Sequence, residues 1–269
     1  MNSGLTLPLV LALVFYAACC LFLYVAQRSF IYFPTAESPN PLAQELRIAS
    51  GDETLQVWQL NPGAELGIIY FGGNAEDVAD NTPLFVDLFP RQTVYLVNYR
   101  GYGGSSGSPS EAGLFADAEA VYDAVRPRHA GVHVIGRSLG SGVAVYLASV
   151  RDVDKLVLVT PYDSIASIAQ HSMPIFPVAL LIKDRYDSTR LAPGLTNQTL
   201  MLLAEQDQVI PRASSEKLME AFQPALITRV VIGGANHNSI GMMASYRAAL
   251  ASFLGAGPWP DSGAAPAGT

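Results

Sequence analysis

The stretch from 133 to 148 limits the possible folds more than any other part of the chain. An apolar strand leads into Gly-Arg-Ser-Leu-Gly at 136–140, and an apolar run with the character of a helix follows at once. A serine between two glycines in this setting is typical of a nucleophile elbow, in which Ser138 lies on a tight turn from a strand to a helix. The flanking glycines leave room for the turn. The motif is short and weak alone, and the strand and helix around it strengthen it.

The composition predicts one large domain with its own core, because half of the 269 residues are hydrophobic. The net charge is −7 and no basic block occurs, which argues against a nucleic-acid partner. The two cysteines, Cys19 and Cys20, both lie in the N-terminal apolar run, and the four histidines show no metal-ligand spacing. We therefore expect no metal and no cofactor.

The N-terminal run from Leu5 to Ala26 carries no charge and is long enough to cross a hydrocarbon core of about 30 Å as a helix. A cleaved signal peptide is the alternative. Against it, the first four residues contain no Lys or Arg, and the run exceeds the usual signal-peptide core of about 7–15 residues. We expect residues 1–27 to form a single-pass anchor in a bacterial inner membrane. Arg28 alone gives little information on which side the remainder lies.

The rest of the chain alternates strand-like and helix-like segments, which predicts an α/β fold with a mostly parallel sheet and helices on both faces. We expect a half-buried strand at 55–60, a buried strand at 68–71 and further strands at 93–98, 155–159, 199–204 and 228–232. Helices are expected at 78–89, 110–125, 212–221 and 239–254, and one more starting near Ser164. Residues 163–198 interrupt this alternation with prolines and an apolar cluster, and predict a small cap; an ordinary helix with a long connection is the alternative. The domain is expected to span 28–254, followed by a disordered tail at 255–269.

Side chains at the carboxyl ends of parallel strands gather on one edge of a sheet. His237, directly after the last predicted strand, is the expected base for Ser138, and Asp207, after the preceding strand, is the expected acid. The order Ser, Asp, His along the chain fits this type of sheet. Asp163 is a weaker alternative for the acid, and we expect it instead to cap a helix or to anchor the cap. The remaining histidines are expected to be structural: His129, His133 and His171.

An acyl-transfer site also needs two N–H donors for the developing oxyanion. One is expected from Leu139, the residue after the nucleophile. The other is expected from the glycine-rich turn at 72–74, most simply the N–H of Asn74, because this turn follows a neighbouring strand of the sheet.

With these residues assembled, the chain resembles the α/β-hydrolases, in particular the membrane-anchored abhydrolase-domain branch, which includes bacterial hydrolases and eukaryotic protein depalmitoylases. The resemblance covers about 27–254 and rests on short motifs: Gln27-Arg28 with Tyr32 and Pro34, Phe71-Gly72-Gly73-Asn74-Ala75, Asn98-Tyr99-Arg100-Gly101-Tyr102-Gly103 with Gly107 and Ser110-Glu111, Gly136 to Gly140, Asp184 with Tyr186-Asp187-Ser188, Asp207 with Pro211, and His237-Asn238. Family members usually carry His-Gly-Asn where this chain has Gly72-Gly73-Asn74, which affects the support of the oxyanion loop. The resemblance implies an acyl hydrolase acting on esters or thioesters, and some relatives are described as serine peptidases.

The predicted function is a membrane-anchored serine hydrolase that cleaves acyl esters or thioesters of a small molecule, a lipid or an acylated protein. Ser138, Asp207 and His237 are the predicted catalytic residues, and Asn74 and Leu139 the predicted oxyanion donors. A peptidase or aminopeptidase using the same three residues is one alternative. A non-catalytic binding protein is another, although a scaffold has no need of these residues in this order.

Overall fold

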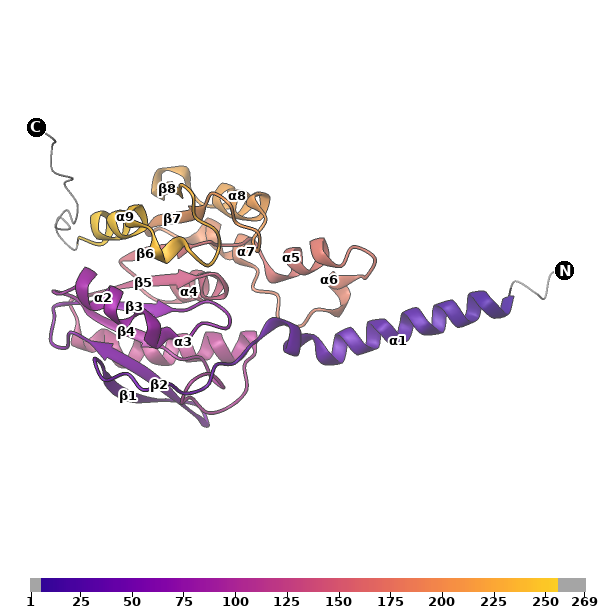
Figure 1. Cartoon of the computed structure of the whole chain (residues 1–269), viewed down its shortest axis with the longest axis horizontal. Coiled ribbons are helices and arrows are strands. Elements are labelled where there is room, and N and C mark those ends of the chain that lie inside the picture. Colours follow the sequence, from indigo (N-terminus) through magenta and orange to yellow (C-terminus); the bar gives the residue numbers. More distant parts are fainter. Residues whose placement is uncertain (1–5, 256–269) are drawn as a thin grey trace, which may run out of the picture.

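A sheet of eight strands forms the centre of the structure, a computed structural model that describes residues 6–255 (Figure 1). The spatial order is β1-β2-β4-β3-β5-β6-β7-β8, and all pairs from β4 to β8 are parallel, while β1 and β2 run antiparallel to their neighbours. The strands are β1 (Gln44–Ser50), β2 (Glu53–Leu60), β3 (Leu66–Phe71), β4 (Thr93–Val97), β5 (Gly131–Arg137), β6 (Lys155–Val159), β7 (Gln198–Ala204) and β8 (Ile227–Ile232). The predicted mostly parallel α/β fold is confirmed.

Helices cover both faces of the sheet and close two apolar cores. One core lies between the sheet and α3 (Glu111–Val125), α4 (Leu139–Val150) and α8 (Arg212–Ala221). The other lies between the opposite face and α2 (Thr82–Leu88) with α9 (Ala244–Leu254). Because the central strands are buried on both faces, they are continuous apolar runs in the sequence.

The structure corrects the prediction for β2. Residues 55–60 were expected to be half-buried, yet all six are buried, including Gln56 and Gln59. Gln56 accepts hydrogen bonds from Asn98 Nδ2 and from the Gly104 N–H, and Gln59 donates to the Tyr95 hydroxyl. The alternating polar residues of this strand therefore lie in a buried, hydrogen-bonded layer and not on a face exposed to solvent. Strand β1, which is mostly exposed, was not predicted.

Several predicted helices occur with small shifts at their ends. Ser110 caps α3 by accepting a hydrogen bond from the Gly113 N–H, as its position before Glu111 suggests. The expected final helix begins only at Ala244, because a short 3₁₀ turn occupies Ile240–Met242. The predicted disordered tail lies outside the described residues, except for Gly255.

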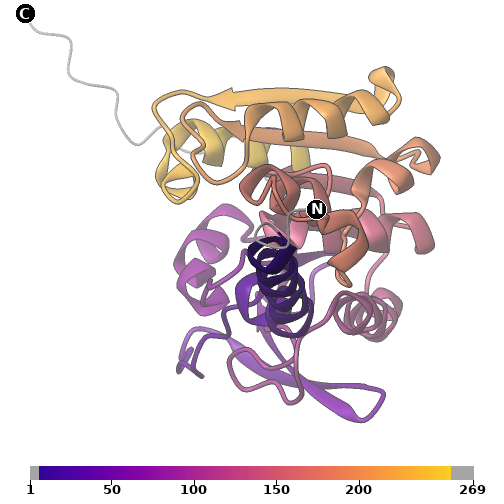
Figure 2. The same cartoon turned by 90° about the vertical axis from the view of Figure 1, so that its right-hand side faces the viewer.

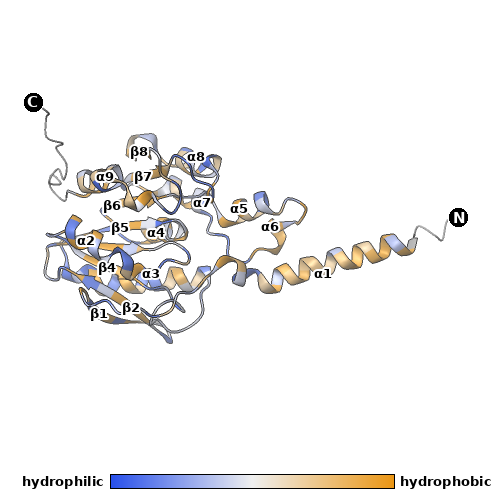
Figure 3. Cartoon of the chain, viewed as in Figure 1, coloured by the Kyte–Doolittle hydropathy of each residue, from blue (hydrophilic) through white to orange (hydrophobic). Residues whose placement is uncertain are grey.

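The N-terminal helix α1 (Thr6–Ile31) projects from the body beside the segment predicted as a cap (Figure 1; Figure 2 views it end-on). This cap segment contains α5 (Ile165–Ser172), α6 (Val178–Leu181) and α7 (Ser188–Leu191). Helix α1 is apolar along almost its whole length (Figure 3), and among the described residues it alone is long and apolar enough to cross a membrane. Its large apolar side chains are mostly exposed, so the fold itself does not bury them.

Candidate active site

Ser138 lies between the end of β5 and the start of α4, on the predicted tight turn. Its backbone has φ 49° and ψ −116°, a strained conformation for a residue with a side chain. The turn needs both flanking glycines. A Cβ on Gly136 would lie 2.3 Å from the Gly140 carbonyl oxygen, and a Cβ on Gly140 would lie 2.1 Å from the Phe71 carbonyl oxygen. The elbow therefore packs directly against the end of β3.

The structure brings the three predicted catalytic residues into one hydrogen-bonded chain. His237 Nε2 lies 3.0 Å from Ser138 Oγ, and His237 Nδ1 lies 2.9 and 3.1 Å from the two oxygens of Asp207. An ionised carboxylate only accepts hydrogen bonds, so Nδ1 carries the proton and Nε2 is free to accept from the serine. The geometry is that of a nucleophile, a base and an orienting acid.

Asp207 is held by its own loop as well as by the imidazole. Its Oδ1 accepts hydrogen bonds from the N–H groups of Val209 and Ile210, at 2.9 and 2.8 Å. Burial by itself raises the pKa of this carboxyl, but the hydrogen bonds from His237 and the two backbone N–H groups outweigh that effect. The pKa of Asp207 consequently lies below its ordinary value, and the group is ionised at neutral pH.

Asp163, the alternative acid, lies in a different set of contacts. Its carboxylate is buried and accepts hydrogen bonds from Ser214 Oγ at 2.6 Å and from Lys217 Nζ at 2.7 Å, which join the start of the cap to α8. Ser164, not Asp163, caps α5. Of the two roles expected for Asp163, anchoring of the cap segment fits the structure, and capping of the helix does not.

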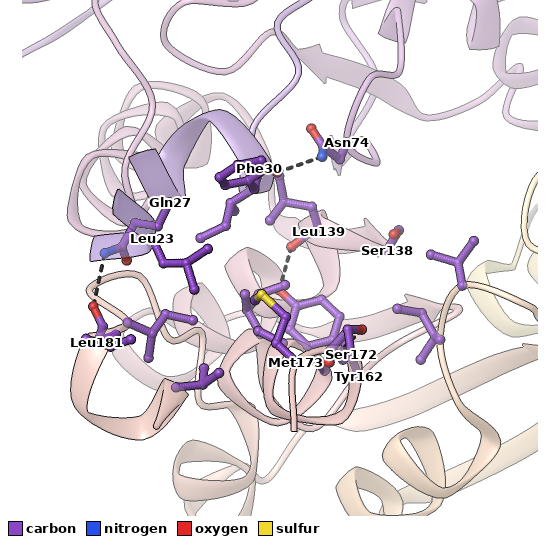
Figure 4. Close-up of a pocket in the computed structure, with 18 residues that line it drawn as sticks. Leu23, Gln27, Phe30, Asn74, Ser138, Leu139, Tyr162, Ser172, Met173 and Leu181 are labelled. Carbon is purple, nitrogen blue, oxygen red and sulfur yellow. Dashed lines mark hydrogen bonds between the residues drawn. The ribbon is translucent and has the colours of Figure 1, made fainter. Parts of the chain in front are cut away.

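The two residues expected to donate to the oxyanion, Leu139 and Asn74, line the same pocket as the serine. Leu139 is the first residue of α4, and an N–H at that position has no acceptor within its own helix. Asn74 lines the same pocket as Ser138 and Leu139 (Figure 4). Its side chain holds the loop to the end of α1: Nδ2 donates to the Ile31 carbonyl, and Oδ1 accepts from the Phe33 N–H.

A partly buried ion pair that the sequence did not reveal supports the same loop. Glu76 accepts hydrogen bonds from the Gly73 N–H and from Arg137, while Arg137 also donates to the His237 carbonyl at 3.2 Å. Burial by itself lowers the pKa of the Arg137 guanidinium, but the adjacent Glu76 carboxylate raises it by more, so the pKa of Arg137 lies above its ordinary value. The pair therefore connects the oxyanion loop, the nucleophile turn and the histidine loop. Its only sequence signal is a charged residue beside each predicted loop.

Glu205 and His129 make contacts that support the fold. Glu205 is exposed, and it accepts a hydrogen bond from the Gly234 N–H at 2.7 Å, which braces the turn before His237. His129 is buried and bonds to the Tyr95 hydroxyl and the Ala64 carbonyl. Within residues 6–255, no group of three or more His, Cys, Asp or Glu side chains is arranged to hold a metal ion.

An apolar pocket of about 350 Å³ opens beside Ser138 (Figure 4). It is bounded by α1, by the cap segment and by the loop after β7. The residues from these three parts are Leu23, Gln27, Phe30 and Ile31; Ile165, Ile168, Ala169, Ser172, Met173, Val178, Leu181 and Ile182; and Val209 and Ile210. A pocket of this lining suits an apolar group and has few polar atoms to hold a charged one.

Comparison with known proteins gives consistent matches. The family model described as "Alpha/beta hydrolase family" matches residues 71–261. An uncharacterized protein of Mycobacterium tuberculosis is 33% identical over 238 residues, which cover 81% of this chain and 83% of that protein. Alpha/beta hydrolase domain-containing protein 17C of Xenopus tropicalis is 28% identical over 72% of this chain, and the match spans 63% of its length.

Solved structures with the same fold include two esterases. The esterase Pf2001 of Pyrococcus furiosus has a TM-score of 0.67 at 16% identity, with 83% of this chain and 97% of that chain covered. The esterase EaEST of Exiguobacterium antarcticum has a TM-score of 0.63 at 17% identity, with 79% and 100% covered. At this level of identity the likeness is one of fold.

Proposed function

Since the chain belongs to the alpha/beta hydrolase family, we propose that it is a membrane-anchored serine hydrolase that cleaves acyl esters or thioesters. The observation that carries the proposal is the chain of hydrogen bonds from Asp207 through His237 to Ser138, with the serine at the wall of an apolar pocket. The fold alone does not specify this chemistry, and the proposal rests on the residues of the site.

In the proposed reaction, Ser138 Oγ attacks the acyl carbonyl while His237 Nε2 takes the hydroxyl proton. Asp207 holds the imidazole and stabilises its cation. The N–H groups of Leu139 and Asn74 bind the oxyanion, and loss of one such donor typically costs about 2.7–4 kcal/mol. His237 then gives its proton to the leaving alcohol or thiol. A water molecule, deprotonated by the same histidine, hydrolyses the acyl-enzyme and regenerates the serine.

An acyl ester or thioester is favoured over a peptide by two features. The pocket beside Ser138 is apolar, and burial of a methylene contributes about 0.8 kcal/mol. Glu205, the acidic side chain near Asp207 in sequence, has one oxygen engaged by the Gly234 N–H, and a single exposed carboxylate is weak support for binding of a peptide's amino terminus. An ester or thioester also has a better leaving group than an amide and demands less of the general acid.

Retention of α1 as a membrane anchor is supported by its contacts with the rest of the chain. Gln27 and Arg28 bond to the cap segment, and Tyr32, one residue beyond the helix, is buried. A cleaved signal peptide has no need of such contacts. The exposed apolar side chains along α1 require an apolar environment, which a bilayer supplies. We propose residues 1–27 as the anchor and residues 28–254 as the hydrolase domain, with the cap at about 163–198.

The decisive experiment compares substrates on the full chain in detergent micelles. We expect p-nitrophenyl butyrate to be hydrolysed with a much higher kcat/KM than aminoacyl p-nitroanilides. Ser138→Ala should lose ester hydrolysis and fluorophosphonate labelling, whereas Ser149→Ala, an exposed serine on α4, should retain both. Efficient cleavage of the anilides would favour the peptidase alternative. Absence of both hydrolysis and labelling in the wild-type chain would favour a non-catalytic binding protein.

A further inference from the structure

Helix α1 is attached to the cap segment along much of its length. Near its end, Gln27 donates to the Leu181 carbonyl and accepts from the Lys183 N–H, at 3.0 and 2.6 Å. Farther toward the N-terminus, the Tyr16 hydroxyl donates to the Ile175 carbonyl, and the Tyr16 ring stacks on Phe176 with centroids 5.7 Å apart. A tether needs only its end joined to the domain, so these contacts indicate a fixed position for the helix beside the cap.

A buried polar cluster fixes the end of α1 to the body. Asp184 accepts hydrogen bonds from Arg28 at 2.9 Å and from the Tyr32 hydroxyl at 3.1 Å, and the Tyr32 and Tyr186 hydroxyls lie 2.9 Å apart. Tyr32, Asp184 and Tyr186 are all buried. The position of the helix relative to the active site is therefore held by groups that would be costly to leave without partners.

One face of α1 forms the wall of the pocket that lies opposite the nucleophile. Leu23 and Gln27 lie at one side of the pocket and Ser138 at the other (Figure 4), with Met173 of the cap between them. A chain bound to Ser138 and extending through the pocket would thus meet the anchor helix at its far end.

A second apolar hollow continues from the pocket along the helix. It is lined by Ala18, Cys19, Phe22 and Leu23 of α1 and by Phe176 of the cap, and Leu23 also lines the first pocket. At 1.5 Å per residue, Ala18 and Ile31 are about 20 Å apart along the helix axis. Apolar surface therefore extends from Ser138 to a level well inside the uncharged part of α1.

The tip of the cap lies at that same level. Ile175 and Leu180 are 72% and 82% exposed, although both are large apolar residues. The contact of Tyr16 with Ile175 and Phe176 places this tip beside the middle of the proposed span. Exposed apolar side chains beside a membrane-spanning helix are in a suitable environment only if they too lie in lipid.

We propose that α1 is part of the substrate-binding site: the acyl chain of a substrate embedded in the bilayer passes from the lipid, between α1 and the inserted tip of the cap, into the pocket beside Ser138. This proposal rests on the proposed function. The acyl chain stays in apolar surroundings throughout, while the ester or thioester carbonyl reaches the serine near the end of α1. The helix thereby sets acyl-chain selectivity as well as location.

The first test places a large side chain in the wall. Leu23→Trp is compared with Leu21→Trp, the same substitution on a face of α1 that is 64% exposed and lines neither hollow. The measurement is the ratio of kcat/KM on p-nitrophenyl dodecanoate to that on p-nitrophenyl acetate, with the full chain in micelles. Displacing two methylenes at about 0.8 kcal/mol each predicts a ratio roughly fifteenfold lower for Leu23→Trp. Leu21→Trp should keep the wild-type ratio.

Fluorophosphonate labelling of both variants verifies that the elbow is folded. An unchanged ratio in a labelled Leu23→Trp variant would overturn the proposal and leave the hydrolase function intact. An unlabelled, inactive wild-type chain would instead overturn the proposed function.

The second test locates the tip of the cap. Ile175→Trp in vesicles should be quenched by lipids brominated on their acyl chains, above the background from the native tryptophans. Val150→Trp, at the end of α4 that points away from Ser138, should not be quenched. Equal quenching of the two variants would exclude insertion of the cap.

Discussion

Glu76 and Arg137, 61 residues apart in the sequence, form a partly buried ion pair that contacts three loops of the candidate site. Glu76 accepts a hydrogen bond from the Gly73 N–H of the oxyanion loop, and Arg137 donates one to the carbonyl of His237. Neither side chain lines the pocket beside Ser138. We therefore expect the pair to affect catalysis indirectly, by positioning the loops that line the pocket.

We expect Glu76→Gln to lower kcat by about 10² with a smaller change in KM, because a displaced donor loop is misaligned with the transition state. Steady-state kinetics on a p-nitrophenyl ester give both parameters. Glu119→Gln removes one partner of the surface pair with Arg151 and should change neither. If Glu76→Gln raised KM and left kcat unaltered, the pair would act in substrate binding rather than in positioning.

Asp207→Asn should lower kcat by about 10⁴, because the amide can hold the wrong tautomer of His237. Asp163→Asn should leave the hydrogen bonds between His237 and Ser138 in place, and its kcat should stay within a few-fold of wild type. Both variants are compared on one ester with the full chain. The reverse outcome would move the acid role to Asp163.

Asp163→Asn should instead lower stability, by about 1–3 kcal/mol, because Ser214 and Lys217 lose a buried charged acceptor. Burial by itself raises the pKa of Asp163, but the hydrogen bonds from Lys217 and Ser214 lower it to a net value below the ordinary one. The stabilisation is thus complete above the unfolded pKa of about 3.9 and is lost as pH falls through the lower folded value. The difference in Tm between wild type and variant, in detergent, should shrink below about pH 4. A constant difference from pH 3 to 7 would show that charge is not the cause.

Membrane anchoring predicts that the full chain stays in the membrane pellet after washing with alkaline carbonate, because only an integral segment resists that treatment. Asp184→Asn, which removes the charged partner of Arg28, should lower Tm and should not release the protein. Release of the wild-type chain into the supernatant would contradict the spanning helix.

The parts of the fold and site that sequence could predict are those encoded locally. The buried strands are apolar runs, Ser110 and Glu111 mark the start of a helix, and the glycines around Ser138 mark the elbow. The positions of Asp207 and His237 follow from strand order, since parallel strands present their carboxyl ends together.

The features that were missed depend on partners far away in the chain. Gln56 is a polar residue that is nevertheless buried, because two of its hydrogen-bond partners come from a loop more than 40 residues later. The bond from Gln27 to the cap joins residues 154 positions apart, and no periodicity within α1 indicates it. The role of such a residue can be predicted only when the topology is known, because its hydrogen-bond partners lie far away in the sequence.

The position of His237 after the last strand has a consequence for heat inactivation. β8 lies at the margin of the sheet order with β7 as its one neighbouring strand, and only Ile232 within it is fully buried. Strands with so little burial open by local fluctuation at a lower free energy than the core. We expect amide protons of β8 to exchange faster than those of β5, and turnover to fade on warming before the molecule melts as a whole. The nucleophile would then be the last part of the site to be lost, and the base the first.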